Sequence, residues 1–373
     1  VEKRVTDLLS QMSVEEKTCQ LATLYGYGRV LKDSLPVAGW KNEIWKDGIA
    51  NIDEMLNGVG KKSAQVPGLL YPFSNHAEAV NTVQRWFVEE TRLGIPVDFT
   101  NEGIHGLNHT KATPLPAPIA IGSTWNKELV RRAGVIAGQE AKALGYTNVY
   151  APILDIVRDP RWGRTLECYG EEPYLIAALG TEMVNGIQSQ GVSACPKHFA
   201  CNNQETMRIY NDSRVSERAL REIYLKGFEI CVKTAHPFNI MTSYNKINGV
   251  WGHYHYGTCT QILRGEWEYD GCVMTDWWMR ACKDPDFPLL RNNAYRVRGQ
   301  VDVLMPGAGA GSRKAKYDPT LLESLGKPDG ITRAEIFRSA MNTLRFVLRS
   351  HPFCAEHGLD NGYRPGPDWF ECR

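Results

Sequence analysis

The stretch GCVMTDWW, residues 271–278, joins a short apolar run to a carboxylate and two indole rings. Residues 272–275 have the small and β-branched composition of a strand that is buried on both faces, as in a parallel sheet. In barrels of alternating strands and helices, catalytic side chains lie where strands end. Asp276 follows this strand directly, so we expect it to be either a catalytic carboxylate or the cap of the next helix.

Seven further segments are predicted as strands, and helices separate most of them. The other expected strands are residues 48–52, 95–100, 118–122, 147–153, 192–199, 239–244 and 301–307. Apolar residues recur at helical spacing over residues 5–24, and helices are expected over 76–92, 126–144, 173–188, 216–233, 260–269 and 332–349.

This alternation predicts an α/β fold, because parallel neighbouring strands need a crossover between them. Eight units predict a single-domain (β/α)8 TIM-type barrel over residues 1–350, with residues 351–373 as a C-terminal linker or strap. A doubly wound open sheet is the alternative, but no GxGxxG motif follows a predicted strand.

Composition and motif spacing argue against several classes of partner. The chain has 373 residues, 23% of them charged, and a net charge of +1, which argues against nucleic-acid and anionic-membrane partners. No apolar run reaches the roughly 18 residues that a membrane span needs. His105, His109 and His198 follow different strands without an HExxH pattern, so we expect neither a metal nor another cofactor.

Polar side chains gather where the predicted strands end. Glu102 follows the strand at 95–100, Arg164 lies in the loop after 147–153, and Tyr244 ends the strand at 239–244. Lys197 and His198 stand together near the end of the strand at 192–199. A structural explanation of this pair is that Lys197 forms an ion pair and His198 is a core residue. Five such strand ends, however, predict a pocket that binds sugar hydroxyls with charge-assisted hydrogen bonds.

These segments resemble the family 3 glycoside hydrolases, and the β-glucosidase branch in particular. The resemblance runs from about residue 5 to residue 350. The segments that carry it are RDPRWGRTLECYGE at 158–171, PKHFA at 196–200, NDSRVSER at 211–218, TSYNKING at 242–249, LRGEW at 263–267 and VMTDW at 273–277.

The resemblance implies a retaining mechanism, in which a carboxylate forms a covalent glycosyl intermediate that water then hydrolyses. It makes Asp276 the nucleophile, with Lys197 and Arg164 expected to keep it ionised. Glu102 stands where the family usually has an Asp that holds distal hydroxyls of the sugar. The other residues with implied roles are Arg164, Lys197, His198 and Tyr244, which bind the sugar in the first subsite, and Trp277, which lines the approach of the leaving group.

The general acid of this mechanism is not identified in the chain. In two-domain members of the family it comes from an α/β-sandwich domain, whereas the β-N-acetylhexosaminidases use an Asp–His pair in the loop after the Lys–His motif. Here Arg214 stands where that His would be needed. Glu167 and Glu205 are conceivable acids, but their spacing does not favour them.

We therefore expect a glycosidase that acts on a β-linked glucoside or oligosaccharide, with an α/β-sandwich domain or a second chain as a partner that supplies the acid. The alternatives are a β-xylosidase, a β-N-acetylhexosaminidase, or a non-catalytic sugar-binding barrel without its acid.

Overall fold

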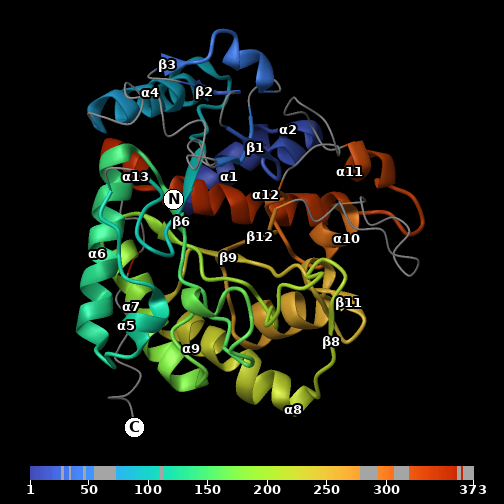
Figure 1. The fold of residues 1–373 in the computed structure, drawn as a ribbon. Coiled ribbons are helices and arrows are strands. Elements are labelled where there is room, and N and C mark those ends of the chain that lie inside the picture. Colours follow the sequence, from blue (N-terminus) through green and yellow to red (C-terminus); the bar gives the residue numbers. More distant parts are fainter. Residues whose placement is uncertain are drawn as a thin grey trace.

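Parallel strands form the centre of the fold and helices surround them (Figure 1). The computed structural model describes residues 1–26, 29–32, 35–44, 48–53, 73–109, 112–277, 293–305, 319–358 and 363. Five strands pair in parallel in the order β1 (Thr23–Tyr25), β4 (Asn51–Asp53), β5 (Asp98–Glu102), β6 (Asn148–Tyr150) and β7 (Ser193–Ala194). A second parallel pair consists of β9 (Asn239–Met241) and β12 (Cys272–Met274).

Isolated parallel bridges connect these two groups of strands. Phe199 bridges Thr242, which links the segment after β7 to the segment after β9. Met274 of β12 bridges Val303, and Leu304 bridges Ala22, the residue before β1. The chain is therefore an α/β fold with a parallel sheet, and its first and last strand segments are neighbours.

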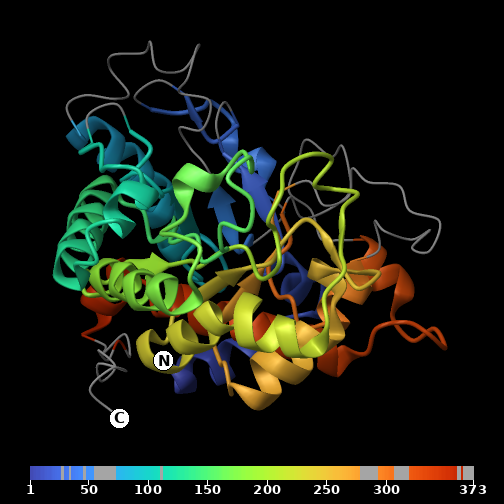
Figure 2. The same cartoon turned by 60° about the horizontal axis from the view of Figure 1, so that its bottom comes forward.

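Helices pack outside the strands (Figures 1 and 2). The helix α6 packs on α7 and α7 packs on α9, while α12 packs on α1 and α2. Of the helices in the described ranges, none is both long and apolar enough to cross a membrane. Their bounds are α1 (Glu2–Gln11), α2 (Val14–Cys19), α4 (Phe73–Arg85), α5 (Pro118–Gly122), α6 (Lys127–Leu144), α7 (Pro173–Gln188), α8 (Glu217–Ala219), α9 (Lys226–Ala235), α10 (Asn293–Arg298), α11 (Pro319–Ser324), α12 (Arg333–Leu348) and α13 (His351–His357).

Shorter elements connect this framework. Small sheets consist of β2 (Leu31–Lys32) with β3 (Leu35–Pro36), and of β8 (Asp212–Ser213), β10 (Lys246–Ile247) and β11 (Val250–Trp251). The 3-10 turns are η1 (Trp40–Glu43), η4 (Thr165–Glu167) and η6 (Gly252–Tyr254), and the π-helical segments are η3 (Trp86–Glu90), η5 (Leu220–Tyr224) and η7 (Gly257–Glu266).

Local signals in the sequence correctly predict the ends of several helices. The Asn126 side chain accepts a hydrogen bond from the Leu129 N–H and begins α6, and Gly145 ends α6 with a φ of 88°. Capping boxes at Ser13 and Thr332 begin α2 and α12.

Two predictions of secondary structure are wrong. Residues 118–122 form the helix α5 rather than a strand, because Pro118 is its first residue and a short apolar run has no clear period. The helical pattern predicted over residues 5–24 ends at Cys19, and Thr23–Tyr25 forms β1. The predicted strand at 301–307 forms only the bridges at Val303 and Leu304, and residues 306 and 307 lie outside the described ranges.

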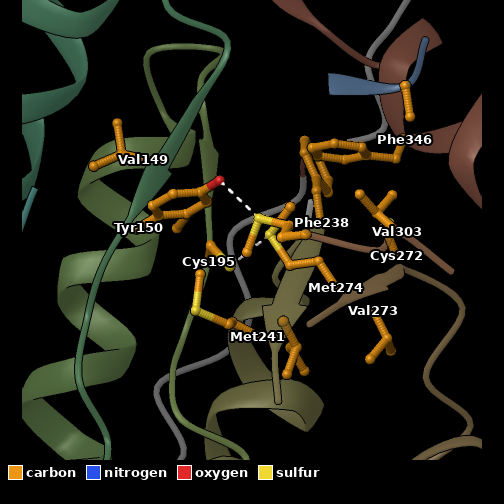
Figure 3. Packing of buried hydrophobic residues seen from close by; sticks show 14 of the residues in the cluster. Val149, Tyr150, Cys195, Phe238, Met241, Cys272, Val273, Met274, Val303 and Phe346 are labelled. Carbon is orange, nitrogen blue, oxygen red and sulfur yellow. Dashed lines mark hydrogen bonds between the residues drawn. The ribbon is translucent and has the colours of Figure 1, made fainter. Parts of the chain in front are cut away.

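The interior between the strands is filled by aromatic and sulfur-containing side chains (Figure 3). The Tyr150 hydroxyl donates a hydrogen bond to the Met305 sulfur at 3.2 Å. The Cys195 thiol contacts the Met274 sulfur at 3.7 Å. Soft, unbranched sulfur groups fill irregular gaps well, and here Met274, Met305 and Cys195 pack among the strands.

Candidate active site

The predicted polar site residues come together at the carboxyl ends of the parallel strands. Glu102 is the last residue of β5, and Asp276 lies two residues beyond β12. Lys197 and His198 follow β7, and Tyr244 follows β9. Because strands of one parallel sheet end on the same side, residues separated by up to 174 positions in the sequence meet in one network.

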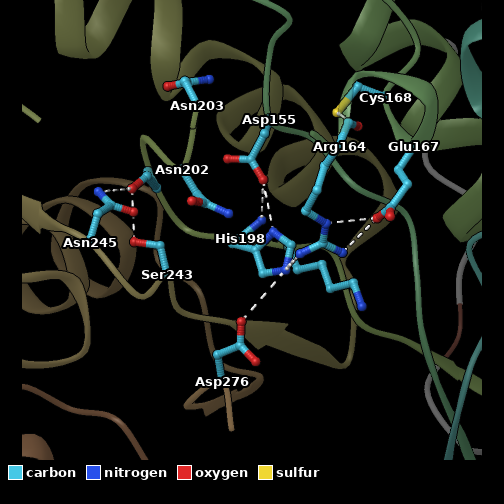
Figure 4. Close-up of polar contacts among 12 residues, drawn as sticks. Asp155, Arg164, Glu167, Cys168, His198, Asn202, Asn203, Ser243, Asn245 and Asp276 are labelled. Carbon is cyan, nitrogen blue, oxygen red and sulfur yellow. Dashed lines mark hydrogen bonds and ion pairs between the residues drawn. The ribbon is translucent and has the colours of Figure 1, made fainter. Parts of the chain in front are cut away.

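Asp276 is buried and is held from two sides (Figure 4). Its Oδ1 accepts the backbone N–H of Trp277 at 2.7 Å, and its Oδ2 lies 3.7 Å from His198 Nε2. Burial raises the pKa of Asp276, whereas the Trp277 N–H and the cations Lys197 and Arg208 lower it. Nearby cations therefore lower the pKa of Asp276, as predicted, but burial outweighs them.

Arg164 joins the loop after β6 to the centre of the site (Figure 4). Its Nε and Nη2 donate to the Oε2 of Glu167 at 2.8 and 2.6 Å, and its Nη1 lies 3.0 Å from His198 Nε2. Burial opposes the charge of Arg164, but Glu167 and the carboxylates of Asp276 and Glu102 raise its pKa overall. Arg164 is therefore a fixed cation beside Asp276.

The His198 ring is held from its other side by Asp155. Oδ2 of Asp155 lies 2.9 Å from both His198 Nδ1 and the His198 backbone nitrogen. Burial lowers the pKa of His198 well below its usual value, and Arg164 and Lys197 lower it further. Burial raises the pKa of Asp155 to about 8, against the effect of the hydrogen bond from the His198 backbone N–H.

Lys197 and Glu102 form an ion pair across the pocket. The Lys197 Nζ donates to the Oε2 of Glu102 at 2.8 Å. Only 2% of the Lys197 side chain is exposed, compared with 33% for Glu102, so the carboxylate rather than the ammonium faces open space. The Lys197 ammonium also lies 5.5 Å from the centre of the Tyr150 ring.

Tyr244 and Arg208 complete the site, and sequence reasoning did not identify Arg208. Burial raises the pKa of Tyr244, and so does the nearby Asp276 carboxylate, to which its hydroxyl is hydrogen-bonded. The Arg208 guanidinium lies over the Tyr244 ring, 4.2 Å from its centre. The only sequence signal was the stretch NNQETMR at residues 202–208, soon after the Lys–His pair.

The two conceivable general acids are both engaged as hydrogen-bond acceptors. Glu167 pairs with Arg164, as described above. Glu205 accepts from Arg208 Nη1 at 2.8 Å and from the Trp162 indole N–H at 3.1 Å. In the loop at 212–214, Arg214 pairs with Asp212 at 2.6 Å. Each of the three carboxylates is thus paired with an arginine.

A cavity of about 600 Å³ opens beside this network. Glu102, Arg164 and Glu167 line one side, and the loop with His105 and His109 lines the other. Asp276 does not line this cavity, so the open space adjoins the nucleophile candidate rather than containing it. The cavity is large enough for one sugar residue and part of a second group.

Trp277 supports Asp276 with its backbone while its side chain is buried in the hydrophobic core, with 6% exposed. Its contact with a leaving group stays a prediction. Trp278 lies outside the described residues. Across the described part of the chain, no group of three or more His, Cys, Asp or Glu side chains is arranged to hold a metal ion.

Comparisons with known proteins agree on one family. The family described as "Glycosyl hydrolase family 3 N terminal domain" matches residues 53–310. A β-glucosidase of Ruminococcus albus is 36% identical over 333 residues, which are 87% of this chain and 34% of that protein. An exo-α-(1→6)-L-arabinopyranosidase of Bifidobacterium longum is 40% identical over 198 residues, which are 49% of this chain and 26% of that protein.

Solved structures of β-glucosidases are also similar to this chain. β-Glucosidase 3B of Thermotoga neapolitana in complex with glucose superposes with a TM-score of 0.70 at 29% identity, covering 97% of this chain and 44% of that one. A β-glucosidase of Kluyveromyces marxianus in complex with glucose gives a TM-score of 0.69 at 26% identity, covering 97% and 35%. The chain thus spans less than half the length of these relatives.

Proposed function

This chain belongs to glycosyl hydrolase family 3, and from that premise we propose that it is a retaining, exo-acting β-glycosidase that hydrolyses β-glucosides or short β-glucans. The observation that carries the proposal is the position of Asp276. It is a buried carboxylate at a strand end, with Arg164, Lys197, Arg208 and Tyr244 around it.

The geometry favours Oδ2 of Asp276 as the attacking atom. Oδ1 already accepts the Trp277 N–H, whereas Oδ2 faces His198. In the first step a bond forms between Oδ2 and the anomeric carbon as the bond to the leaving oxygen breaks, and that oxygen takes a proton. In the second step water attacks the same carbon and releases Asp276, with retention of configuration.

The sugar would lie between Asp276 and the Lys197–Glu102 pair. Arg164, Lys197 and Glu102 offer charged partners for hydroxyl groups, and the cavity beside Glu102 provides room. The glucose bound in the two solved relatives supports this assignment of substrate class.

We assign the proton donor to a partner, because Glu167 and Glu205 are tied to arginines. An α/β-sandwich domain or a second chain would place a carboxylic acid about 5 to 5.5 Å from Asp276, the separation that retention requires.

We further propose that the strands close into an eight-stranded (β/α)8 barrel over residues 1–350, followed by a linker or strap. The bridges from Phe199 to Thr242, from Met274 to Val303 and from Leu304 to Ala22 support this closure. The similarity to solved family members over 97% of the chain supports it as well.

A mechanism-based label tests the nucleophile without needing the general acid. We would incubate the chain with 2,4-dinitrophenyl 2-deoxy-2-fluoro-β-glucoside, whose leaving group needs little protonation, and locate the adduct by peptide mass spectrometry. We expect the adduct on Asp276, and an adduct on any other residue would refute the assignment.

Variants sharpen this test. Asp276→Gly should lose turnover of an aryl β-glucoside, and added azide should restore it with α-glucosyl azide as the product, because azide attacks from the vacated face. Asp270→Asn is the matched control, since its carboxylate is 71% exposed and lies outside the network; we expect it to keep full activity.

A sugar-binding protein without catalysis is the second candidate, and the engaged states of Glu167 and Glu205 are the observation that favours it. Glucose binding in calorimetry without labelling of Asp276 would support this reading. Parallel assays with aryl β-xyloside and aryl β-N-acetylglucosaminide would test the other sugar classes, because Glu102 carries one more methylene than the Asp usual at this place.

A further inference from the structure

We propose that Asp155 is a positioning residue that fixes His198 as the neutral tautomer with its hydrogen on Nδ1, which leaves Nε2 as a hydrogen-bond acceptor at the centre of the site. The role deepens the proposed function and rests on it, because an accepting Nε2 holds the Arg164 guanidinium beside Asp276, where both would meet the bound sugar. Both residues are buried: Asp155 is 3% exposed and His198 is 2% exposed.

The contacts of Asp155 converge on one oxygen (Figure 4). Its Oδ2 lies 2.9 Å from Nδ1 of His198 and 2.9 Å from the backbone nitrogen of the same residue. A backbone N–H is always a donor, so Oδ2 acts as an acceptor there. One oxygen therefore holds both the main chain and the ring of His198.

The other side of the ring decides which nitrogen carries the hydrogen. Arg164 Nη1 lies 3.0 Å from Nε2, and a guanidinium group can only donate hydrogen bonds. Nε2 must then accept, and a neutral imidazole with an accepting Nε2 carries its hydrogen on Nδ1. An imidazolium would direct an N–H at the guanidinium, and the lowered pKa of His198 agrees with the neutral ring.

The tautomer matters for the nucleophile. Nε2 lies 3.7 Å from the Oδ2 of Asp276, the oxygen that we assign to attack. A hydrogen on Nε2 would point at that oxygen and reduce its nucleophilicity, and it would also repel Arg164. With the hydrogen on Nδ1, the ring donates nothing to the Asp276 oxygen, and Nε2 accepts the hydrogen bond of Arg164.

A purely structural role for Asp155 is the competing explanation, since the same oxygen holds the backbone. The two explanations differ in the tautomer. Long-range ¹H–¹⁵N correlation spectra of the chain labelled with ¹⁵N-histidine report which ring nitrogen is protonated, and the variant His198→Gln identifies the His198 signal. We expect the Nδ1–H form from pH 6 to 8. An Nε2–H form or an imidazolium would overturn the proposal, whatever any variant does.

The variant Asp155→Leu tests the cause. Oδ2 of Asp155 is the acceptor for both His198 contacts, and leucine has a similar size but offers Nδ1–H no acceptor. We expect the Nε2–H form to appear and the Kd for glucose, measured by calorimetry, to rise about 10- to 100-fold. Asp159→Leu is the matched control, because Asp159 is in the same loop and its carboxylate pairs with exposed Arg161; it should change neither the tautomer nor the Kd.

The outcomes separate the two proposals. Failure of the unaltered chain to bind glucose would contradict the proposed function but leave the tautomer measurement valid. Asp155→Leu with weaker glucose binding and an unchanged tautomer would indicate the structural role and refute ours. An unchanged tautomer with unchanged binding would refute it too.

Discussion

His76 offers a quantitative test of how burial controls charge in this fold. It lies in α4 with no exposed surface, and neither ring nitrogen has a hydrogen-bond partner among the described residues. Its ring centre is 5.5 Å from that of Tyr146 and 6.2 Å from that of His109. Burial, together with a smaller effect of His109, lowers the pKa of His76 to about 3.

The sign and size of the effect follow from proton linkage. Below pH 6.5 the unfolded chain binds a proton at His76 that the folded chain does not, so the free energy of unfolding falls by about 1.4 kcal/mol per pH unit down to about pH 3. Between pH 6.5 and 5, His76 should therefore cost the protein about 2 kcal/mol of stability. His76→Phe keeps a ring of similar size and removes this loss.

Urea unfolding at pH 7.5, 6.5, 5.75 and 5, followed by tryptophan fluorescence, measures the difference between the two proteins. We expect the stability of the Phe variant relative to the unaltered chain to increase by about 2 kcal/mol over this range. His236→Asn is the control, because His236 is exposed and has a φ of 46°, which Asn tolerates. Equal slopes for the Phe variant and the unaltered chain would show that folded His76 accepts a proton in this range and would refute the reasoning.

Three other predictions concern packing and the site. Gly186→Ala should lower the free energy of unfolding, measured with urea, by about 1–3 kcal/mol. The added Cβ would lie 2.3 Å from the backbone carbonyl oxygen of Arg131 in the neighbouring helix α6. Gly227→Ala, whose Cβ meets nothing closer than 3.7 Å, should change it by less than about 1 kcal/mol, and equal effects would contradict the packing. Arg208→Gln should raise the pKa of Asp276 and move the acid limb of fluoroglycoside labelling to higher pH, and an unmoved limb would show that this charge does not act on the proposed nucleophile. Lys197→Met should weaken glucose binding about 10- to 100-fold in calorimetry, since it removes the buried cation of the pocket, whereas unchanged affinity would place the sugar elsewhere.

Features that depend on neighbours in the sequence were predictable. The ends of α6 follow from Asn126 and Gly145, and the capping boxes at Ser13 and Thr332 follow from residues three positions apart. The parallel sheet followed from the alternation of apolar runs with helices. Residues 118–122 were misassigned because five apolar residues are too few to show a period, and the Pro that begins α5 was read as part of a strand.

Some residues of the site could likewise be predicted from the sequence, and others could not. Asp276, Lys197 and Tyr244 could be chosen from the sequence, because each ends a predicted strand and parallel strands end on one side. Asp155 also follows a predicted strand, but its role depends on a contact with His198, 43 positions away. Arg208 could not be chosen, since its role depends on stacking over the Tyr244 ring. Loop residues have no period that would predict such contacts.

The sequence by itself determined the family, the α/β class and the strand ends that carry the polar groups, because these depend on composition and local order along the chain. Only the tertiary structure decided how those groups are charged. Burial raises the pKa of Asp276 despite the neighbouring cations, and folding pairs Glu167 with Arg164 and Glu205 with Arg208. Desolvation and ion pairing depend on which residues, far apart in the sequence, become neighbours. Those contacts form only when the chain folds.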